Sequence, residues 1–439
     1  MRDALNAATV QMLDAQIERH PTLPPEAVLK TELLRRGIAF APEALIPPAD
    51  AQEHQLKSYF IFSFNMVKQS ELDGTAQWKA PEEVALTGGP YHLRRTIVSV
   101  RLNPASPYKV ILHEGERRLT VEGELLACVQ LPVKPAHYNC TLPDGKSAGE
   151  IAPTIQWGYL IYLTIFRICQ YFGEKEECQF CDINHNYREQ IAAGRPYTGV
   201  KKVDDILAAL EYIANSDSPA KAYTLTGGSI TSQLEGKSEV EFYTQYVEAI
   251  ERRFPGRWIG KVVTQAWPKA DVQRLKDAGA MIYHPNYEVW DPRLFELISP
   301  GKNRYIGRDE WVRRIVEAAD IFGPSRVIPN FVGGVEMAKP YGFDDVEEAI
   351  ESTRQGLDFF MNHGVVPRFT TWCPEPTTPL GKANPEGAPL EFHLRLLEVY
   401  RDTLASHRLP PPPGYGDPGP GRAVFSVSPF MDVLPAREE

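Results

Sequence analysis

The second half of the chain alternates apolar, β-branched runs with amphipathic runs of helical period, beginning at Trp157. The predicted strands are residues 157–167, 222–226, 258–264, 281–284, 326–332 and 366–372. The predicted helices are residues 203–215, 239–254, 269–278, 308–322, 346–363 and 390–405. Strands that are each followed by a helix indicate parallel pairing through right-handed crossovers. The sequence therefore predicts an α/β fold with a parallel sheet.

Three of the six cysteines lie in the loop that leaves the first predicted strand. Cys169, Cys178 and Cys181 have the spacing C-x8-C-x2-C within residues 163–186. The carboxyl edge of parallel strands is where α/β proteins build their sites. Three thiolates can hold three irons of a [4Fe–4S] cluster, which leaves the fourth iron open to a ligand with its own donor atoms. Two alternatives are a Cys3His zinc site completed by His185 and a set of ordinary buried cysteines.

Composition limits the classes of protein that remain. The chain has 439 residues, 43% hydrophobic and 24% charged, with a net charge of 47 − 57 = −10. This charge disfavours a nucleic-acid partner bound through broad phosphate contacts, and no apolar run reaches membrane-spanning length. The first residues lack the apolar segment of a secretory signal, and six cysteines in so long a chain are no disulfide framework. We therefore expect a cytoplasmic protein without membrane contact.

Three regions are expected along the chain. Residues 1–150 form an amino-terminal α+β module, residues 151–405 the strand–helix repeats, and residues 406–439 a Pro/Gly-rich tail. The module's predicted helices are residues 4–18 and 25–36, and its predicted strands are residues 58–67, 95–102, 108–113, 117–121 and 125–131.

The tail differs from the rest in composition. Residues 409–421 read L-P-P-P-P-G-Y-G-D-P-G-P-G, which excludes a helix or a central strand. Residues 423–427 are predicted to add a short edge strand, and the chain end is expected to be surface-bound or disordered.

The cysteine loop resembles that of radical S-adenosylmethionine (SAM) enzymes. In that family the open iron chelates the amino and carboxylate groups of SAM, and an aromatic residue before the last cysteine packs near the adenine; Phe180 occupies this place. The commonest family spacing is C-x3-C-x2-C, so the first interval here is five residues longer. The resemblance implies a partial (β/α)6 barrel, and a doubly wound open sheet is the alternative.

Motifs after the second and fourth predicted strands extend the resemblance. Gly227, Gly228 and Ser229 match the place of a Gly-Gly-Glu element that binds the SAM amino group, and Ser229 in place of the acid implies a backbone role only. Asn286 and Glu288 match an Asn-x-Asp/Glu element of biotin synthase-like members whose acid contacts the SAM ribose. A carboxylate accepts strong hydrogen bonds from two hydroxyls. An ordinary turn and a polar loop cluster are the respective alternatives.

Three further positions follow from the same resemblance. Arg304 is the first choice, and Arg308 the second, for a guanidinium against the SAM carboxylate, with a solvated basic loop as the alternative. Gly333 matches the glycine of a G-x-I-x-G-x-x-E element that flanks the adenine. Residues 372–380, W-C-P-E-P-T-T-P-L, resemble a Pro-x-x-Thr-Pro-Leu segment of the same proteins.

The resemblance implies an enzyme that cleaves SAM reductively at a [4Fe–4S] cluster, with a small-molecule substrate and a reductant such as flavodoxin or ferredoxin. The reaction class, the substrate and the catalytic residue stay unspecified. Cys128, Cys140 and Cys373 are candidate ligands of an auxiliary cluster, although ordinary buried cysteines are the simpler interpretation. The competing hypothesis is a zinc-stabilised binding or scaffold protein without turnover.

Overall fold

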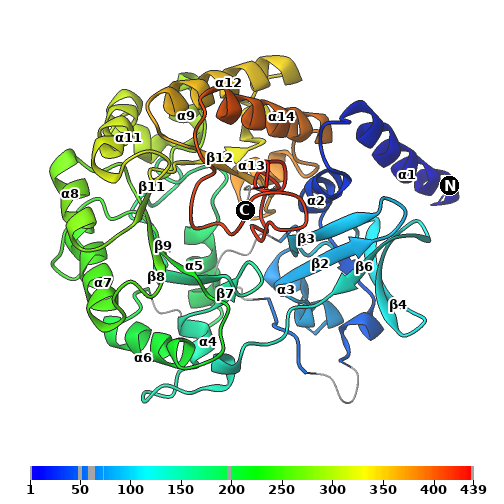
Figure 1. The fold of residues 1–439 in the computed structure, drawn as a ribbon, viewed down its shortest axis with the longest axis horizontal. Coiled ribbons are helices and arrows are strands. Elements are labelled where there is room, and N and C mark those ends of the chain that lie inside the picture. Colours follow the sequence, from blue (N-terminus) through cyan, green and yellow to red (C-terminus); the bar gives the residue numbers. More distant parts are fainter. Residues whose placement is uncertain (1, 48–51, 58–64, 73, 195–198, 437–439) are drawn as a thin grey trace.

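Six parallel strands, four in one sheet and two in another, curl around the centre of the molecule, and the short β7 (Thr154–Ile155) pairs antiparallel with β8 (Figure 1). The computed structural model describes residues 2–47, 52–57, 65–72, 74–194 and 199–436. The strands are β8 (Leu160–Phe166), β9 (Ala222–Gly227), β10 (Ile259–Thr264), β11 (Ile282–Pro285), β12 (Asn330–Gly333) and β13 (Arg368–Thr371). Each is found within the range, or within one residue of the range, that the sequence predicted.

The strands follow one another around the barrel in the order of the sequence. β8 to β11 pair as parallel neighbours, and so do β12 and β13. Isolated parallel bridges from Tyr283 to Val327 and from Glu288 to Phe331 join β11 to the β12 segment. A doubly wound sheet reverses its strand order near the middle. The partial (β/α)6 barrel is therefore confirmed, and the open-sheet alternative is wrong.

The predicted crossover helices cover the outside of the barrel, as Figure 1 shows. They are α6 (Val203–Ala214), α7 (Glu239–Arg253), α8 (Lys269–Asp277), α11 (Arg308–Phe322), α12 (Val346–Asn362) and α14 (Leu390–Ser406). Ser238 starts α7 with a capping box, since its side chain accepts from the Glu241 backbone N–H while Glu241 reaches back to the Ser238 N–H. Shorter helices lie in the loops: α5 (Ile183–Ala192), α9 (Pro292–Ile298), α10 (Pro300–Tyr305) and α13 (Pro379–Ala383).

The amino-terminal module packs beside the barrel. Its helices are α1 (Arg2–Arg19), α2 (Pro25–Arg36), α3 (Gln69–Leu72) and α4 (Ala148–Ile151). Its sheet has the order β1-β4-β5-β6-β2-β3. The strands are β1 (Ala39–Phe40), β2 (Glu83–Gly88), β3 (Leu93–Ser99), β4 (Tyr108–His113), β5 (Glu116–Val121) and β6 (Glu124–Gln130).

The strands of the amino-terminal sheet differ from the predicted ones in two places. The sequence did not predict β2, which lies between β6 and β3. Most of the predicted strand at residues 58–67 lies outside the described residues, and residues 65–67 are not a strand.

Helix α2 joins the module to the barrel, because Ala27 and Val28 pack in the barrel core while Leu29 and Leu33 pack in the module core.

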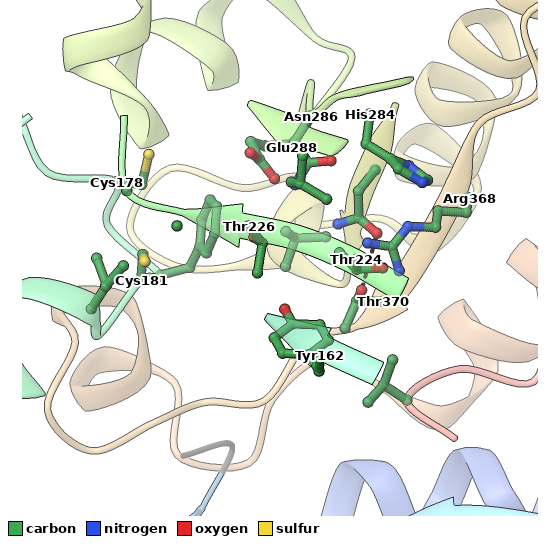
Figure 2. Close-up of a pocket in the computed structure, with 18 of the residues that line it drawn as sticks. Tyr162, Cys178, Cys181, Thr224, Thr226, His284, Asn286, Glu288, Arg368 and Thr370 are labelled. Carbon is green, nitrogen blue, oxygen red and sulfur yellow. Dashed lines mark hydrogen bonds between the residues drawn. The ribbon is translucent and has the colours of Figure 1, made fainter. Parts of the chain in front are cut away.

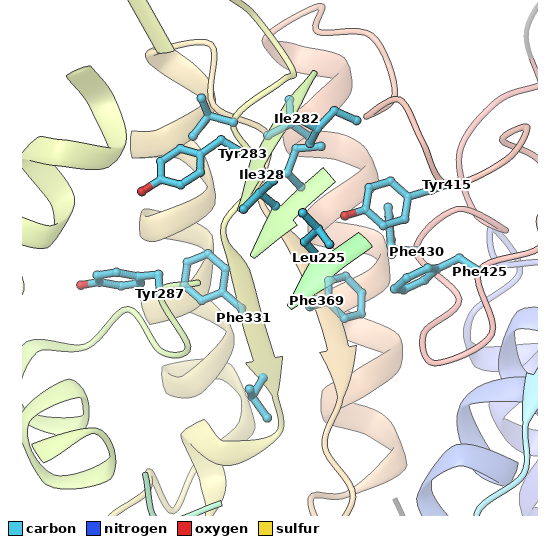
Figure 3. Packing of buried hydrophobic residues seen from close by; sticks show 14 of the residues in the cluster. Leu225, Ile282, Tyr283, Tyr287, Ile328, Phe331, Phe369, Tyr415, Phe425 and Phe430 are labelled. Atoms are coloured by element: carbon cyan, nitrogen blue, oxygen red, sulfur yellow. The ribbon is translucent and has the colours of Figure 1, made fainter. Parts of the chain in front are cut away.

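Most of the tail up to Leu434 is buried or half-buried, which corrects the expectation of a surface-bound or disordered end for these residues; residues 437–439 lie outside the described residues. Figure 3 shows the rings of Tyr415, Phe425 and Phe430 packed together beside Phe369 of β13. The predicted edge strand at residues 423–427 does not form, and only an isolated bridge links Gly416 to Ala423. Proline and glycine prevent regular pairing, but they do not prevent aromatic side chains from being buried.

Two edge strands hold the tail by backbone hydrogen bonds. The Thr371 N–H of β13 donates to the Val427 carbonyl at 3.1 Å, and the Ser99 N–H of β3 donates to the Ser426 carbonyl at 3.0 Å. The tail therefore lies between the barrel and the module. No helix of the described ranges is long and apolar enough to cross a membrane.

A buried ion pair fixes the tail to α2. Lys30 and Asp432 are both 0% exposed, and the Lys30 Nζ lies 2.8 Å from the Asp432 carboxylate. Lys30 also donates to the Phe425 carbonyl at 2.6 Å, and the Thr96 hydroxyl donates to Asp432 at 3.1 Å. Lys30, Asp432 and Thr96 therefore all have hydrogen-bond partners within this buried set.

We expect Asp432→Ala to lower the free energy of unfolding by about 3–5 kcal/mol, because it leaves the Lys30 charge buried without its partner. Glu211→Ala is the matched control, since it breaks the exposed Arg253–Glu211 pair and should cost at most about 1 kcal/mol. Urea denaturation measures both values. Equal losses in the two variants would show that the Lys30–Asp432 pair does not secure the tail.

Candidate functional site

A cavity of about 250 Å³ lies inside the barrel and is lined at one end by the cysteine loop (Figure 2). Alternate residues of each strand face this cavity, as expected where successive side chains point to opposite faces of a sheet. These residues are Leu160 and Tyr162, Thr224 and Thr226, Lys261 and Val263, His284 and Asn286, Asn330 and Val332, and Arg368 and Thr370. The tail adds Tyr415, Phe425 and Val427.

The three predicted cysteine ligands converge on this cavity. Cys169, Cys178 and Cys181 all line it, together with Phe180. Asn184, at the start of α5, shapes the loop: its Oδ1 accepts from the Cys169 N–H at 2.8 Å, and its Nδ2 donates to the Tyr171 carbonyl at 2.9 Å. The sequence analysis did not single out Asn184. Its place in D-I-N-H-N, directly after the last cysteine, was the available signal.

Burial keeps the three thiols protonated until a metal centre binds. It raises the pKa of Cys178 to about 12 and also raises the pKa values of Cys169 and Cys181. A thiolate is the form that binds metal, so loading this site releases protons.

The donor set does not suit a single metal ion. Within the described part of the chain, no three His, Cys, Asp or Glu side chains gather closely enough to hold one ion. His185, the fourth ligand of the zinc alternative, pairs with Glu189 at 3.2 Å and does not line the cavity. In a [4Fe–4S] cluster each thiolate binds a different iron, so the sulfur atoms lie farther apart than around one zinc ion. Cys169, Cys178 and Cys181, which line one cavity, are the three thiol donors that such a cluster needs.

Gly227 and Gly228 bring β9 against the backbone that enters the cysteine loop. A Cβ atom at Gly228 would lie 2.1 Å from the Ile168 carbonyl oxygen and 2.4 Å from the Cys169 Cα. The Gly228 N–H donates to the Phe166 carbonyl at 2.9 Å. The Ser229 N–H donates to the Cys169 Sγ at 3.4 Å. The two glycines are required here for close backbone approach, and Ser229 acts through its backbone N–H.

Asn286 and Glu288 line the cavity after β11 and share a buried lysine. Lys302 of α10 is ion-paired with Glu288 and donates to the Asn286 carbonyl at 2.9 Å. Burial alone would lower the pKa of Lys302, but the Glu288 carboxylate and the Cys178 sulfur raise it above its usual value. The Asn286 Oδ1 is buried without a partner in the described structure. Glu288 has a φ of 84°, a strained conformation for this residue type.

Arg304, Arg308 and Gly333 do not line the cavity. The Arg304 side chain is 62% exposed and pairs with Glu176 of the cysteine loop from outside. Arg308 lies over the Trp290 ring at 4.7 Å and pairs with Asp309 at 3.0 Å. A Cβ at Gly333 would lie 2.9 Å from Leu396 of α14, so this glycine faces the helix layer. Lys302, which the sequence analysis did not single out, is the basic residue of α10 that lines the cavity.

The three spare cysteines do not gather. Cys373 is 3% exposed and lines the cavity, and burial raises its pKa to about 12. Cys128 lies in β6, where Arg118 contacts its sulfur, and Cys140 follows a 3-10 turn at Ala136–Asn139. Of the three spare cysteines, Cys373 lines the cavity, whereas Cys128 and Cys140 do not.

The amino-terminal module builds one wall of the cavity through Glu83 of β2. Its carboxylate accepts from the Gln156 N–H at 2.7 Å and from the Trp157 N–H at 2.8 Å. Both residues have a φ of 56°, and Gln156 lines the cavity. Glu83 therefore holds a strained turn in the position that presents Gln156 to the site.

Comparison with known proteins gives likeness of fold only. No protein-family model matches the chain, and no curated protein matches it. Methylornithine synthase (PylB) aligns over 55% of this chain and 62% of its own at 17% identity and a TM-score of 0.39. Coproporphyrinogen III oxidase (HemN) from Escherichia coli, described as a radical SAM enzyme, aligns over 57% and 52% at 11% identity and 0.33. A radical SAM methyltransferase from Sphaerobacter thermophilus aligns over 70% and 76% at 13% identity and 0.37.

The match spans less than two thirds of the length of methylornithine synthase. Identities of 17% or less with TM-scores of 0.39 or less carry no argument about reaction or substrate. Any function has to be inferred from the site residues themselves.

The Glu83 carboxyl gives a pH-dependent contribution to stability. Burial raises its pKa to about 7, so the folded chain favours the protonated form. The contribution is complete below the unfolded pKa of about 4.3 and is lost as the pH rises to about 7. We expect the difference in unfolding free energy between the parent and Glu83→Gln to change by about 3 kcal/mol across this range.

Urea denaturation at a series of pH values measures this difference. Subtraction removes the contributions of Glu239 and Glu336, whose pKa values burial also raises. Parallel pH curves for the two proteins would show that Glu83 keeps an ordinary pKa.

Proposed function

We propose that this protein is a radical SAM enzyme acting on a small molecule in the cytoplasm. The observation that supports the proposal is that Cys169, Cys178 and Cys181, with the spacing C-x8-C-x2-C, all line one barrel cavity. An electron-storage cluster uses four protein thiolates, whereas three leave one iron for a ligand. When bound, the reduced cluster supplies an electron that breaks a carbon–sulfur bond of SAM and yields a radical able to take hydrogen from a substrate.

The residues around the cysteines have separate tasks in this proposal. The three thiolates hold three irons, and the backbone at Gly227 to Ser229 keeps the Cys169 turn in place and offers polar groups to the methionyl part of SAM. Phe180 flanks the adenine. Asn286 and Glu288 receive the ribose hydroxyls, and Lys302 fixes their orientation from behind.

The tail and the amino-terminal module keep bulk water from the cavity. Tyr415, Phe425 and Val427 close one side, and the turn at Gln156 closes another. A reactive intermediate in a site open to solvent would be lost to side reactions. A reductant such as flavodoxin or ferredoxin is part of the proposal, since the cluster has to be reduced in every turnover.

Cysteine replacement tests the proposal. Cys169→Ala, Cys178→Ala and Cys181→Ala should each abolish iron binding after anaerobic reconstitution and abolish the formation of 5′-deoxyadenosine from SAM. Cys128→Ala and Cys140→Ala are the controls and should keep about four irons and four sulfides per chain. Iron and sulfide assays with product chromatography supply the readouts.

Two outcomes contradict the proposal. One is a colourless parent protein that carries a single zinc ion. The other is a normal cluster content in any of the three Cys variants expected to lose it.

A further inference from the structure

The inner end of the cavity is basic and contains no acid. Figure 2 shows Arg368 on the opposite side of the cavity from Cys178 and Cys181, with His284, Thr224 and Thr370 around it. The acids that line the cavity are Glu288, Asp182 and Glu375. Glu288 is paired with Lys302, Asp182 accepts from the Asn186 side chain at 2.6 Å, and Glu375 lies in the field of Arg101 and Lys57. None of them is available to balance Arg368.

The Arg368 guanidinium has no hydrogen-bond acceptor or carboxylate partner within the described part of the chain. It stacks at 5.6 Å from the Tyr415 ring centre and at 5.4 Å from that of Phe425. Its Nε is buried without a hydrogen-bond partner. Arg368 is half-buried and lines the cavity, so an anion bound there would supply the charge-assisted hydrogen bonds that the described protein groups do not.

The two neighbouring basic groups, Lys261 and His284, have hydrogen-bond partners, and their lowered pKa values favour the neutral forms. Lys261 donates to the Gly414 carbonyl at 2.7 Å, and burial followed by the Arg368 charge lowers its pKa. The His284 Nδ1 lies 2.6 Å from the Ile328 carbonyl and donates to it, while the Tyr415 hydroxyl donates to Nε2 at 3.1 Å. Burial and the Arg368 charge lower the pKa of His284 too. Arg368 is therefore the fixed positive charge of this end.

We propose that Arg368 is a substrate-binding residue that holds the carboxylate of a small carboxylic acid at the inner end of the cavity. The planar guanidinium fits two carboxylate oxygens. One fixed positive charge matches a single negative charge, whereas a phosphate group of nearly double charge would stay unbalanced. The Thr224 hydroxyl and the Asn330 amide nitrogen, which also line the cavity, supply polar contacts to the same molecule, and the Thr370 hydroxyl orients this amide by donating to the Asn330 Oδ1 at 3.0 Å.

The inference rests on the proposed function for the reaction of the bound acid, whereas the binding of the acid to Arg368 does not depend on it. A SAM molecule chelated by the open iron presents its own carboxylate at the cysteine end. The anion at Arg368 therefore belongs to a second molecule, whose other end extends toward the cysteines. The substrate class is a small monocarboxylate or the carboxylate end of a slightly longer molecule.

The test measures binding of matched acid and amide probes to the full chain without iron. The pairs are acetate and acetamide, butyrate and butyramide, and succinate and succinamide, with inorganic phosphate as a competing anion. Ligand-detected NMR titration follows the parent, Arg368→Gln, Arg368→Lys and Arg257→Gln. Arg257 is the matched control, an exposed arginine that stacks over Trp258 at 5.9 Å on the barrel exterior.

We expect the parent to bind at least one acid about ten-fold or more tightly than its amide, since the amide lacks the charge that makes the paired hydrogen bonds strong. Arg368→Gln should remove this preference. Arg368→Lys should keep part of it, because the charge stays while the planar fork is lost, and Arg257→Gln should keep all of it. Arg368→Lys also decides the question if Arg368→Gln does not fold.

The proposal is overturned if no acid is preferred to its amide, if the preference survives in Arg368→Gln or is undiminished in Arg368→Lys, or if phosphate displaces the acids at lower concentration. Because the protein carries no iron here, failure of the cluster assay leaves this result intact. A preserved cluster with no acid preference would likewise reject only the role of Arg368.

Discussion

A six-stranded partial barrel has an open side, and the rest of this molecule is arranged to cover it. The free edge of β13 carries backbone N–H and C=O groups that need partners, and the inward side chains need protection from water. The tail meets both requirements. The Val427 carbonyl accepts from the Thr371 N–H, and Tyr415 and Phe425 form part of the cavity wall. The buried Lys30–Asp432 pair attaches this closure to α2, and thus to the module whose Glu83 holds Gln156 in place.

The closed cavity has two ends with different electrostatics. At the cysteine end the charges of Glu288 and Lys302 offset each other, and the three thiols line the place of the proposed cluster. At the inner end Arg368 is unbalanced, and the groups around it are neutral or polar. In our proposals this division corresponds to metal and cofactor at one end and an anionic substrate group at the other. It also places the substrate between the reacting centre and a fixed anchor, as positioning of a reactive intermediate requires.

The sequence predicted what depends on local pattern. β-branched runs and helical periodicity located the six parallel strands and the crossover helices, but not the short antiparallel β7. The cysteines, glycines and Asn286–Glu288 were singled out because their motifs follow strand ends. Lys302 was missed because α10 carries two basic residues, and sequence does not say which one faces inward. Residues two apart on a helix point in nearly opposite directions, so Lys302 is buried and Arg304 is exposed. The tail was misjudged because composition excludes regular structure there without revealing a partner about 400 residues away.

The most direct test of the account is electron–nuclear double resonance on the reduced, reconstituted full chain with SAM labelled with ¹⁷O in the carboxylate and ¹⁵N in the amino group. If three cysteines leave one iron open to SAM, both labels should couple to the cluster spin. The coupling should persist in Cys128→Ala and Cys140→Ala, whose thiols lie away from the cavity. A cluster that forms in the parent but shows coupling to neither label would contradict the central claim, because its fourth iron would then be closed to SAM.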